Sequence, residues 1–173
     1  MEVLNLRKSW LAMAGVAALL AVVPSAASAQ TNGPTGISAR IGFFLPTAQL
    51  ARNLGQNWFA FGADYKLNTA NMAAPTEDTL AYLSISGDYY SKGNASAMPI
   101  ALNYNVRASQ IVWSAGVGLD MVRLGTNTTG FAAQVGAAYE FGPGPTPFFV
   151  QAKYFFSSKT DLNGFGIFLG ARF

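Results

Sequence analysis

The sequence has 173 residues, of which 51% are hydrophobic and only 11% are charged, with 11 Lys or Arg against 8 Asp or Glu. It contains no Cys and no His, which excludes disulfides, thiolate nucleophiles, Ser-His-Asp triads and metal centres built from those residues. The net charge of +3 is small and the basic residues are scattered, so we expect no nucleic-acid partner.

The first segment of the chain has the layout of a secretory signal. Two basic residues precede an apolar run from Trp10 to Val23. At about 14 residues the run fits a signal core and is too short for a membrane-spanning helix. Small residues follow, ending at Ala29. We predict that residues 1–29 are a cleaved signal peptide, with cleavage after Ala29, and that residues 30–35 form a short N-terminal segment. An uncleaved membrane anchor is the alternative.

Residues 36–173 alternate between apolar and other side chains with a period of two, which is typical of β-strands. Clusters of Gly, Pro, Asn and Ser interrupt the alternation and divide it into eight segments, each about as long as a tilted strand that crosses a membrane. The segments are Ile37–Leu45, Phe59–Leu67, Ala81–Tyr89, Met98–Val106, Ile111–Met121, Phe131–Phe141, Phe148–Phe156 and Phe165–Phe173.

The two faces of these strands differ in charge. The apolar face carries no charged residue, and its aromatic residues gather near both ends of the strands, as in the aromatic belts of membrane proteins. The other face carries the charges: Arg40, Asp64, Lys66, Asp88, Asp120, Glu140, Lys153 and Arg172. We therefore predict an all-β fold, a transmembrane antiparallel up-and-down β-barrel of eight strands, with the apolar face toward lipid. A soluble barrel with the apolar face inside is the alternative, although Gly and Ala on the other face would cover its exterior poorly.

The last segment reads Phe-Gly-Ile-Phe-Leu-Gly-Ala-Arg-Phe and finishes at Phe173, with apolar residues at alternate positions. It resembles the C-terminal strand of bacterial outer-membrane β-barrels. The whole of residues 36–173 resembles the small eight-stranded outer-membrane β-barrel family (OmpA-barrel, OmpX and OmpW-like). This resemblance implies a location in the bacterial outer membrane, lipid as the surrounding partner, and recognition of the Phe173 strand by the barrel-assembly machinery. It carries no family-wide catalytic motif.

The interior charges predict a network. Four cations face four carboxylates, and an unpaired charge in a narrow lumen of low dielectric is costly, so we expect these residues to pair with one another. Five inward aromatic residues would fill further volume: Phe44, Tyr82, Phe149, Phe155 and Phe168. Because the side chains of an eight-stranded barrel already fill its interior, we expect a plugged lumen rather than an open channel.

Three functions remain open. The first is a structural or surface-interaction role in the cell envelope, which we favour, and we expect a monomer. The second is a narrow, porin-like pore or conduit for small solutes. The third is an enzyme, in which a carboxylate pair such as Asp88 with Asp120 would act as acid and base, but nothing in the sequence singles these residues out. We therefore expect no enzyme, no catalytic residue, no metal and no cofactor.

Four local features of the sequence predict details of the loops and of one strand. Thr47–Gln56 is predicted to contain a short helix, and Lys159–Gly164 to form an external loop tip. The connection Asn68–Leu80 is long for the end of the barrel where we expect tight turns. Gly116 and Gly118 lie within a strand, where we expect them to make room for a bulky side chain across the lumen.

Overall fold

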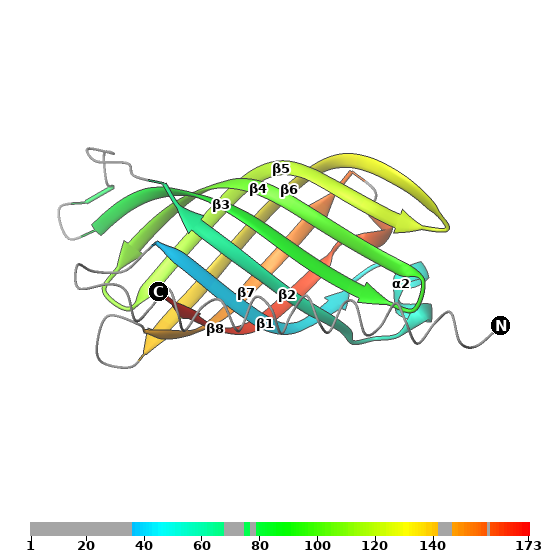
Figure 1. Ribbon diagram of the computed structural model, residues 1–173, viewed down its shortest axis with the longest axis horizontal. Helices are drawn as coiled ribbons and strands as arrows, with labels where there is room; N and C mark the ends of the chain where they lie inside the picture. The colour runs from blue at the N-terminus through cyan, green and yellow to red at the C-terminus, as the bar shows by residue number, and fades with distance from the viewer. Residues whose placement is uncertain (1–35, 68–74, 77–78, 142–146, 159) are drawn as a thin grey trace.

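Each strand of the computed structural model pairs with its neighbours in sequence, and the last strand pairs with the first (Figure 1). The structure describes residues 36–67, 75–76, 79–141, 147–158 and 160–173. Its elements are β1 (Ile37–Pro46), α2 (Gln49–Leu54), β2 (Trp58–Lys66), β3 (Thr79–Lys92), β4 (Ala95–Ala108), β5 (Ile111–Leu124), β6 (Thr126–Phe141), β7 (Phe148–Ser157), η1 (Thr160–Leu162) and β8 (Gly164–Arg172). All neighbouring strands are antiparallel, which confirms the predicted eight-stranded up-and-down barrel.

The two ends of the barrel carry different elements. At one end the N–H of Phe173 donates to the carbonyl of Ile37 (2.8 Å), and the N–H of Gly36 donates to the carbonyl of Phe173 (3.0 Å). We call this the Phe173 end. The short helix α2 and the turn η1 lie at the opposite end, here the α2 end (Figure 1). Odd-numbered strands run from the Phe173 end to the α2 end, and even-numbered strands return.

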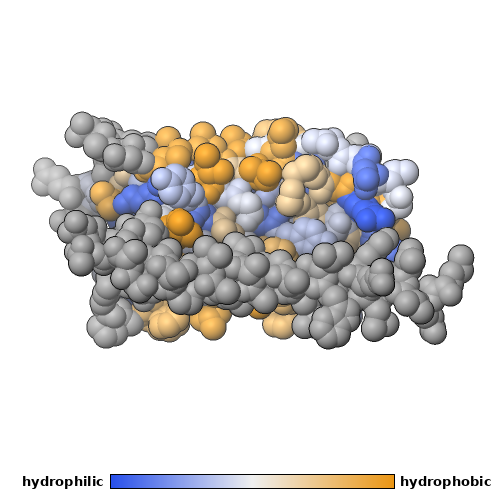
Figure 2. Space-filling view, viewed as in Figure 1, coloured by the Kyte–Doolittle hydropathy of each residue, from blue (hydrophilic) through white to orange (hydrophobic). Residues whose placement is uncertain are grey.

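The wall of the barrel is apolar on its outer side. Adjacent residues on β1 show the alternation, since Phe43 is 60% exposed and Phe44 is fully buried. Large aliphatic and aromatic side chains are exposed on every strand of the barrel, among them Trp113, Leu119 and Phe165. Figure 2 shows hydrophobic side chains along the part of the wall that is visible. Each strand has the inward and outward phase predicted from its sequence, so the charged face is the interior.

The strands in the middle of the sequence are longer than predicted. β3, β4 and β5 have 14 residues each and β6 has 16, because their hairpins continue past the last apolar outward residue. β3 begins at Thr79, two residues earlier than expected. β3 and β4 keep one register from Thr79 to Lys92, with an interruption of two pairs beside Pro99, which has no N–H to donate.

The loops at the α2 end close over the barrel. The predicted helix is confirmed as α2, with Ala51 buried and Leu50 and Leu54 exposed. The segment Lys159–Gly164, predicted as an external loop tip, contains η1 between β7 and β8, and the side chain of Leu162 in η1 is fully buried. No helix within the described ranges is long and apolar enough to cross a membrane.

Glycine allows adjacent strands to approach closely. The expectation that Gly116 and Gly118 make room for a bulky side chain across the lumen is wrong for Gly118, whereas Gly116 makes room for a side chain of the neighbouring strand. A Cβ on Gly116 would overlap the side chain of Asn103, and one on Gly118 would overlap the carbonyl of Ile100. Both Asn103 and Ile100 belong to β4, the strand next to β5. These glycines therefore serve the contact between neighbouring strands.

A pair of glycine substitutions tests this packing. Gly118→Ala should lower the free energy of unfolding by about 1–3 kcal/mol, because the new methyl group meets backbone that cannot rotate away. Gly87→Ala is the matched control, since nothing lies within 4 Å of its Cβ position. Urea unfolding in lipid vesicles, followed by tryptophan fluorescence, measures both. Equal midpoints for the two variants would contradict the assigned role of Gly118.

Candidate functional site in the barrel interior

Four charged side chains meet in the middle of the lumen. Arg40 on β1 forms ion pairs with Asp64 on β2 and Asp88 on β3, and its Nε donates to Asp88 Oδ1 at 2.8 Å. Lys153 on β7 reaches across the lumen and donates from Nζ to Asp88 Oδ2, also at 2.8 Å. We call these four residues the central ion cluster. It holds two cations and two carboxylates, so its formal charge is zero.

Three members of the central ion cluster are buried, Asp64 is half-buried, and Gly62 gives the cluster space. Arg40 is 3% exposed, and Asp88 and Lys153 are 2% exposed. A Cβ on Gly62 would overlap Asp88 Oδ1 and press on the Arg40 guanidinium, so β2 must present glycine there. Each charge lies beside opposite charges inside the barrel, where water is scarce, and removing one partner would leave another uncompensated.

Hydrogen-bonded neutral polar side chains of β3, β4 and β6 form a ladder inside the barrel. Asn103 Nδ2 donates to Ser86 Oγ, and Asn105 Nδ2 donates to Ser84 Oγ, both at 2.9 Å. Gln134 Nε2 donates to the same Ser86 Oγ at 2.8 Å. β6 is not adjacent to β3 or β4 in the sheet, so Gln134 passes over β5, where Gly116 has no side chain to block it. The ladder satisfies buried amides that would otherwise be costly.

A second charged group lies at the Phe173 end. Glu140 on β6 forms ion pairs with Arg107 on β4 and with Arg172 on β8, the latter at 2.5 Å. Arg172 NH1 also donates to the hydroxyl of Tyr82 at 3.3 Å. The Nζ of Lys66 lies 4.9 Å from the centroid of the Tyr82 ring, within cation–π range. We call Lys66, Arg107, Glu140 and Arg172 the Phe173 mouth.

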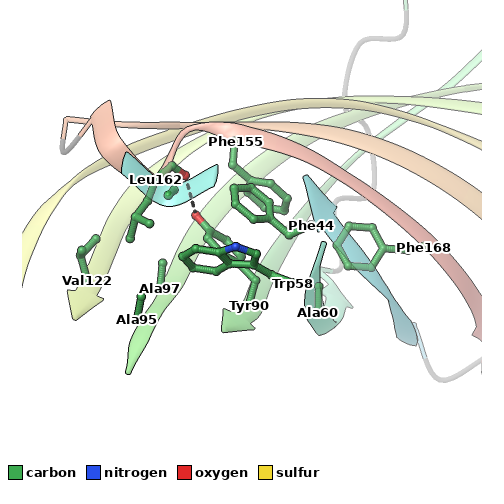
Figure 3. Packing of buried hydrophobic residues seen from close by; sticks show 11 residues of the cluster. Phe44, Trp58, Ala60, Tyr90, Ala95, Ala97, Val122, Phe155, Leu162 and Phe168 are labelled. Atoms are coloured by element: carbon green, nitrogen blue, oxygen red, sulfur yellow. Dashed lines mark hydrogen bonds between the residues drawn. The ribbon is translucent and has the colours of Figure 1, made fainter. Parts of the chain in front are cut away.

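Aromatic side chains fill the α2 end of the lumen. Phe44 stacks on Tyr90 with ring centroids 3.9 Å apart, and Trp58 and Phe155 pack around this pair (Figure 3). The Tyr90 hydroxyl donates to the carbonyl of Leu162 in η1 at 3.3 Å, which ties the loop to the aromatic cluster (Figure 3). We call Phe44, Trp58, Tyr90, Phe155 and Phe168 the aromatic cap. The five inward aromatic residues predicted from sequence are all buried.

Most of the predicted charged residues meet in ion pairs, and two do not. Arg40, Asp64, Asp88 and Lys153 form the central ion cluster, while Glu140 and Arg172 belong to the Phe173 mouth. Lys66 is exposed beside Tyr82. Asp120 is buried at 1% exposure, but no cation forms a salt bridge with it among the described residues. The expectation that Asp120 joins the network is therefore corrected, because its carboxylate accepts hydrogen bonds from Ser157 and from the backbone of Met98 instead of pairing with a cation.

Sequence reasoning missed three interior residues. Arg107, Trp58 and Tyr90 each lie one step beyond the ends assigned to their strands, in the inward phase. Extending the alternation by one residue at those ends would have placed all three in the lumen. Arg107 also changes the charge balance, since it adds a fifth cation to the four cations and four carboxylates that were predicted.

Four further predictions concern the signal cleavage site, Phe173, metal binding and the proposed acid–base pair. The cleavage position after Ala29 lies outside the described residues. Phe173 pairs through its backbone with the start of β1, so the last residue helps to close the barrel. Within the part of the chain that the structure describes, no group of three or more Asp, Glu, His or Cys side chains is arranged to hold a metal ion. Asp88, considered above as half of an acid–base pair, is engaged by Arg40 and Lys153.

Comparison with known proteins finds similarity to solved structures but no match to a family model or a curated protein. No protein-family model matches the chain, and no curated protein matches it. The chain is similar to the outer membrane protein Ail of Yersinia pestis, solved in a phospholipid bilayer nanodisc, with 18% identity, a TM-score of 0.47, and 82% of this chain and 100% of that one covered. It is also similar to the outer membrane enzyme PagL, with 16% identity, a TM-score of 0.47, and 78% and 97% coverage. The fold itself rests on the strand pairing, which gives the chain the eight-stranded barrel architecture that its sequence resemblance implies.

Proposed function

We propose that this chain is an integral β-barrel of the bacterial outer membrane with a structural or surface-interaction role, inserted by the barrel-assembly machinery through the Phe173 strand. The outer wall supports a membrane location, because it exposes apolar side chains such as Leu119 and Ile167 on every side of the closed sheet. A protein in water would leave that surface unsolvated, whereas lipid tails solvate it.

The filled lumen is the observation that carries the structural role. The aromatic cap blocks the α2 end, and the central ion cluster crosses the middle between β1, β2, β3 and β7. The polar cavity between this cluster and the Phe173 end has a volume of about 20 Å³. That is room for roughly one or two water molecules, too little for a continuous aqueous path. The paired charges thus act as a plug that holds opposite walls of the barrel together.

The α2 end supports a role in surface interaction. The β5–β6 hairpin continues beyond the pairing of β6 with β7, which begins only at Ala132. Its tip turns at Gly125, where φ is +79°, and the residues 126–129 that follow are polar and exposed. A paired hairpin with exposed hydroxyl and amide groups is a surface that can contact partners outside the membrane.

Planar-bilayer recording separates this role from the narrow-pore alternative. The purified barrel, inserted at known density, should show no stepwise conductance, because ions would have to pass both the central ion cluster and the aromatic cap. A recognised porin reconstituted by the same procedure is the control for insertion. Reproducible single-channel steps from this chain would reject the plug and favour the pore.

A further inference from the structure

The Phe173 mouth has more positive than negative charge. Arg107 and Arg172 share a single carboxylate, that of Glu140, and Lys66 stands beside them over Tyr82. The four charged side chains therefore carry a formal surplus of two positive charges. The central ion cluster, by contrast, is balanced. The surplus is thus a property of the mouth and not of the whole lumen.

A cavity brings the three cations together. It has a volume of about 80 Å³ and is lined by Gly36, Ile37, Lys66, Leu80, Tyr82, Arg107, Arg172 and Phe173. At roughly 10–15 Å³ for each enclosed water, this space holds a group of several heavy atoms. The side chain of Arg107 is 37% exposed and that of Arg172 is 23% exposed, so a solute reaches both.

The cations have donors to spare. A guanidinium has five N–H groups and an ammonium has three, and Glu140 can accept only some of them. The Nε of Arg107 has no hydrogen-bond partner within the described part of the chain. Donors that converge on one cavity from three strands suit an acceptor with several oxygens rather than a single carbonyl.

We propose that the Phe173 mouth is a binding site for a phosphate group. A phosphate monoester carries about −1.5 to −2 charges at pH 7, so it is attracted to a cluster of three cations, and its three oxygens can accept from both guanidiniums and the ammonium. A carboxylate has only two oxygens, so a group with three oxygens suits the three cations better. The phosphate comes either from solution or from the headgroup of an anionic lipid at the Phe173 end.

Titration of the detergent-solubilised mature chain with inorganic phosphate tests the site. We expect saturable binding by calorimetry, and Lys66→Gln should weaken it about tenfold, because a charge-assisted hydrogen bond is lost. Lys66 suits this test because its side chain is exposed and its loss should leave the barrel folded. Lys92→Gln is the matched control, an exposed lysine at the α2 end of β3 that should leave the affinity unchanged.

A second variant should change the phosphate affinity in the opposite direction. Glu140→Gln removes the competing carboxylate and should tighten phosphate binding several-fold, whereas cations with a purely structural role would bind no phosphate in either variant. A gel shift on heating verifies that each variant is folded, so failure of the site is distinguishable from failure of the barrel. Absence of saturable binding to the folded wild-type chain, or equal weakening by Lys92→Gln, overturns the site.

Two further comparisons identify what occupies the mouth. In vesicles of phosphatidylcholine with phosphatidylglycerol, a lipid source predicts enrichment of phosphatidylglycerol around the wild type that Lys66→Gln removes, and a solution source predicts none. Both results support the site.

Glu77 and Asp78 precede β3 in the sequence. If only the Glu77→Gln/Asp78→Asn variant binds phosphate, the chain's own carboxylates take the place of an external ligand, and the proposal is overturned.

Discussion

Asp88→Asn should be among the most damaging single substitutions in this barrel. Asp88 pairs with both Arg40 and Lys153, so the change leaves two buried cations facing the one remaining carboxylate, Asp64. Breaking a buried ion pair by removing one partner costs about 3–5 kcal/mol. We expect a loss of that order in the free energy of unfolding, measured by urea titration in lipid vesicles. Asp161→Asn, which neutralises an exposed carboxylate in η1, should change the midpoint little.

A double variant separates the effect of the lost ion pairs on stability from the effect of the changed side-chain shape. Adding Lys153→Met to Asp88→Asn restores the balance to one cation and one carboxylate, Arg40 with Asp64. The double variant should therefore be more stable than the sum of the two single changes predicts, by about 1–3 kcal/mol as in other networks of direct contacts. Strictly additive effects would mean that the charges do not act as a unit, and the pairing would then contribute little to holding the barrel walls.

The strands could be predicted because one face of each had to be free of charge. On β5, for example, Trp113, Val117 and Leu119 point outward and are all exposed, while Asp120 points inward and is buried. A slip of one residue would exchange these faces, so the phase of each strand is strongly determined. Apolar alternation of this kind requires no knowledge of which strands are neighbours.

The ends of the strands were harder to predict for the same reason. Beyond Val106 and before Phe131 the outward positions are no longer consistently apolar, yet the strands continue through backbone pairing alone. Arg107 lies in such an extension, so its part in the Phe173 mouth did not emerge from the pattern. The position of Leu162 is different in kind, because a loop residue folded back onto the aromatic cap follows no periodicity.

The ion pairs between interior side chains could not be predicted from the sequence either. The alternation places Asp88 and Lys153 inside, but it does not say how far along the barrel each side chain lies. That depends on the tilt and stagger of all eight strands, which set the levels at which β3 and β7 face one another. Asp120 shows the consequence, since it shares the inward phase with Asp88 and yet has no salt bridge among the described residues.

Trp58→Ala should destabilise the barrel by about 3–5 kcal/mol, as expected when a large buried aromatic side chain is deleted. Trp58 is fully buried in the aromatic cap, packs edge-on against Phe44, and donates from Nε1 to the carbonyl of Gly55 at 2.8 Å. Its neighbour Phe59 is the matched control, since it points outward and is 42% exposed. Phe59→Ala should cost distinctly less in lipid vesicles, because acyl chains fill the space that the ring leaves, whereas nothing refills the cap.

The contrast between these adjacent residues tests which side of the wall faces lipid. In an apolar-inside barrel dissolved in water, Phe59 would be the core residue and its loss would be the larger one. Urea midpoints measured for both variants in the same vesicles decide between the two arrangements. A greater loss for Phe59→Ala than for Trp58→Ala would reverse the assignment of the faces, and with it the membrane location. The expected order follows from the alternation of β2 alone, since Trp58 and Phe59 differ by one residue and lie on opposite faces of the same strand.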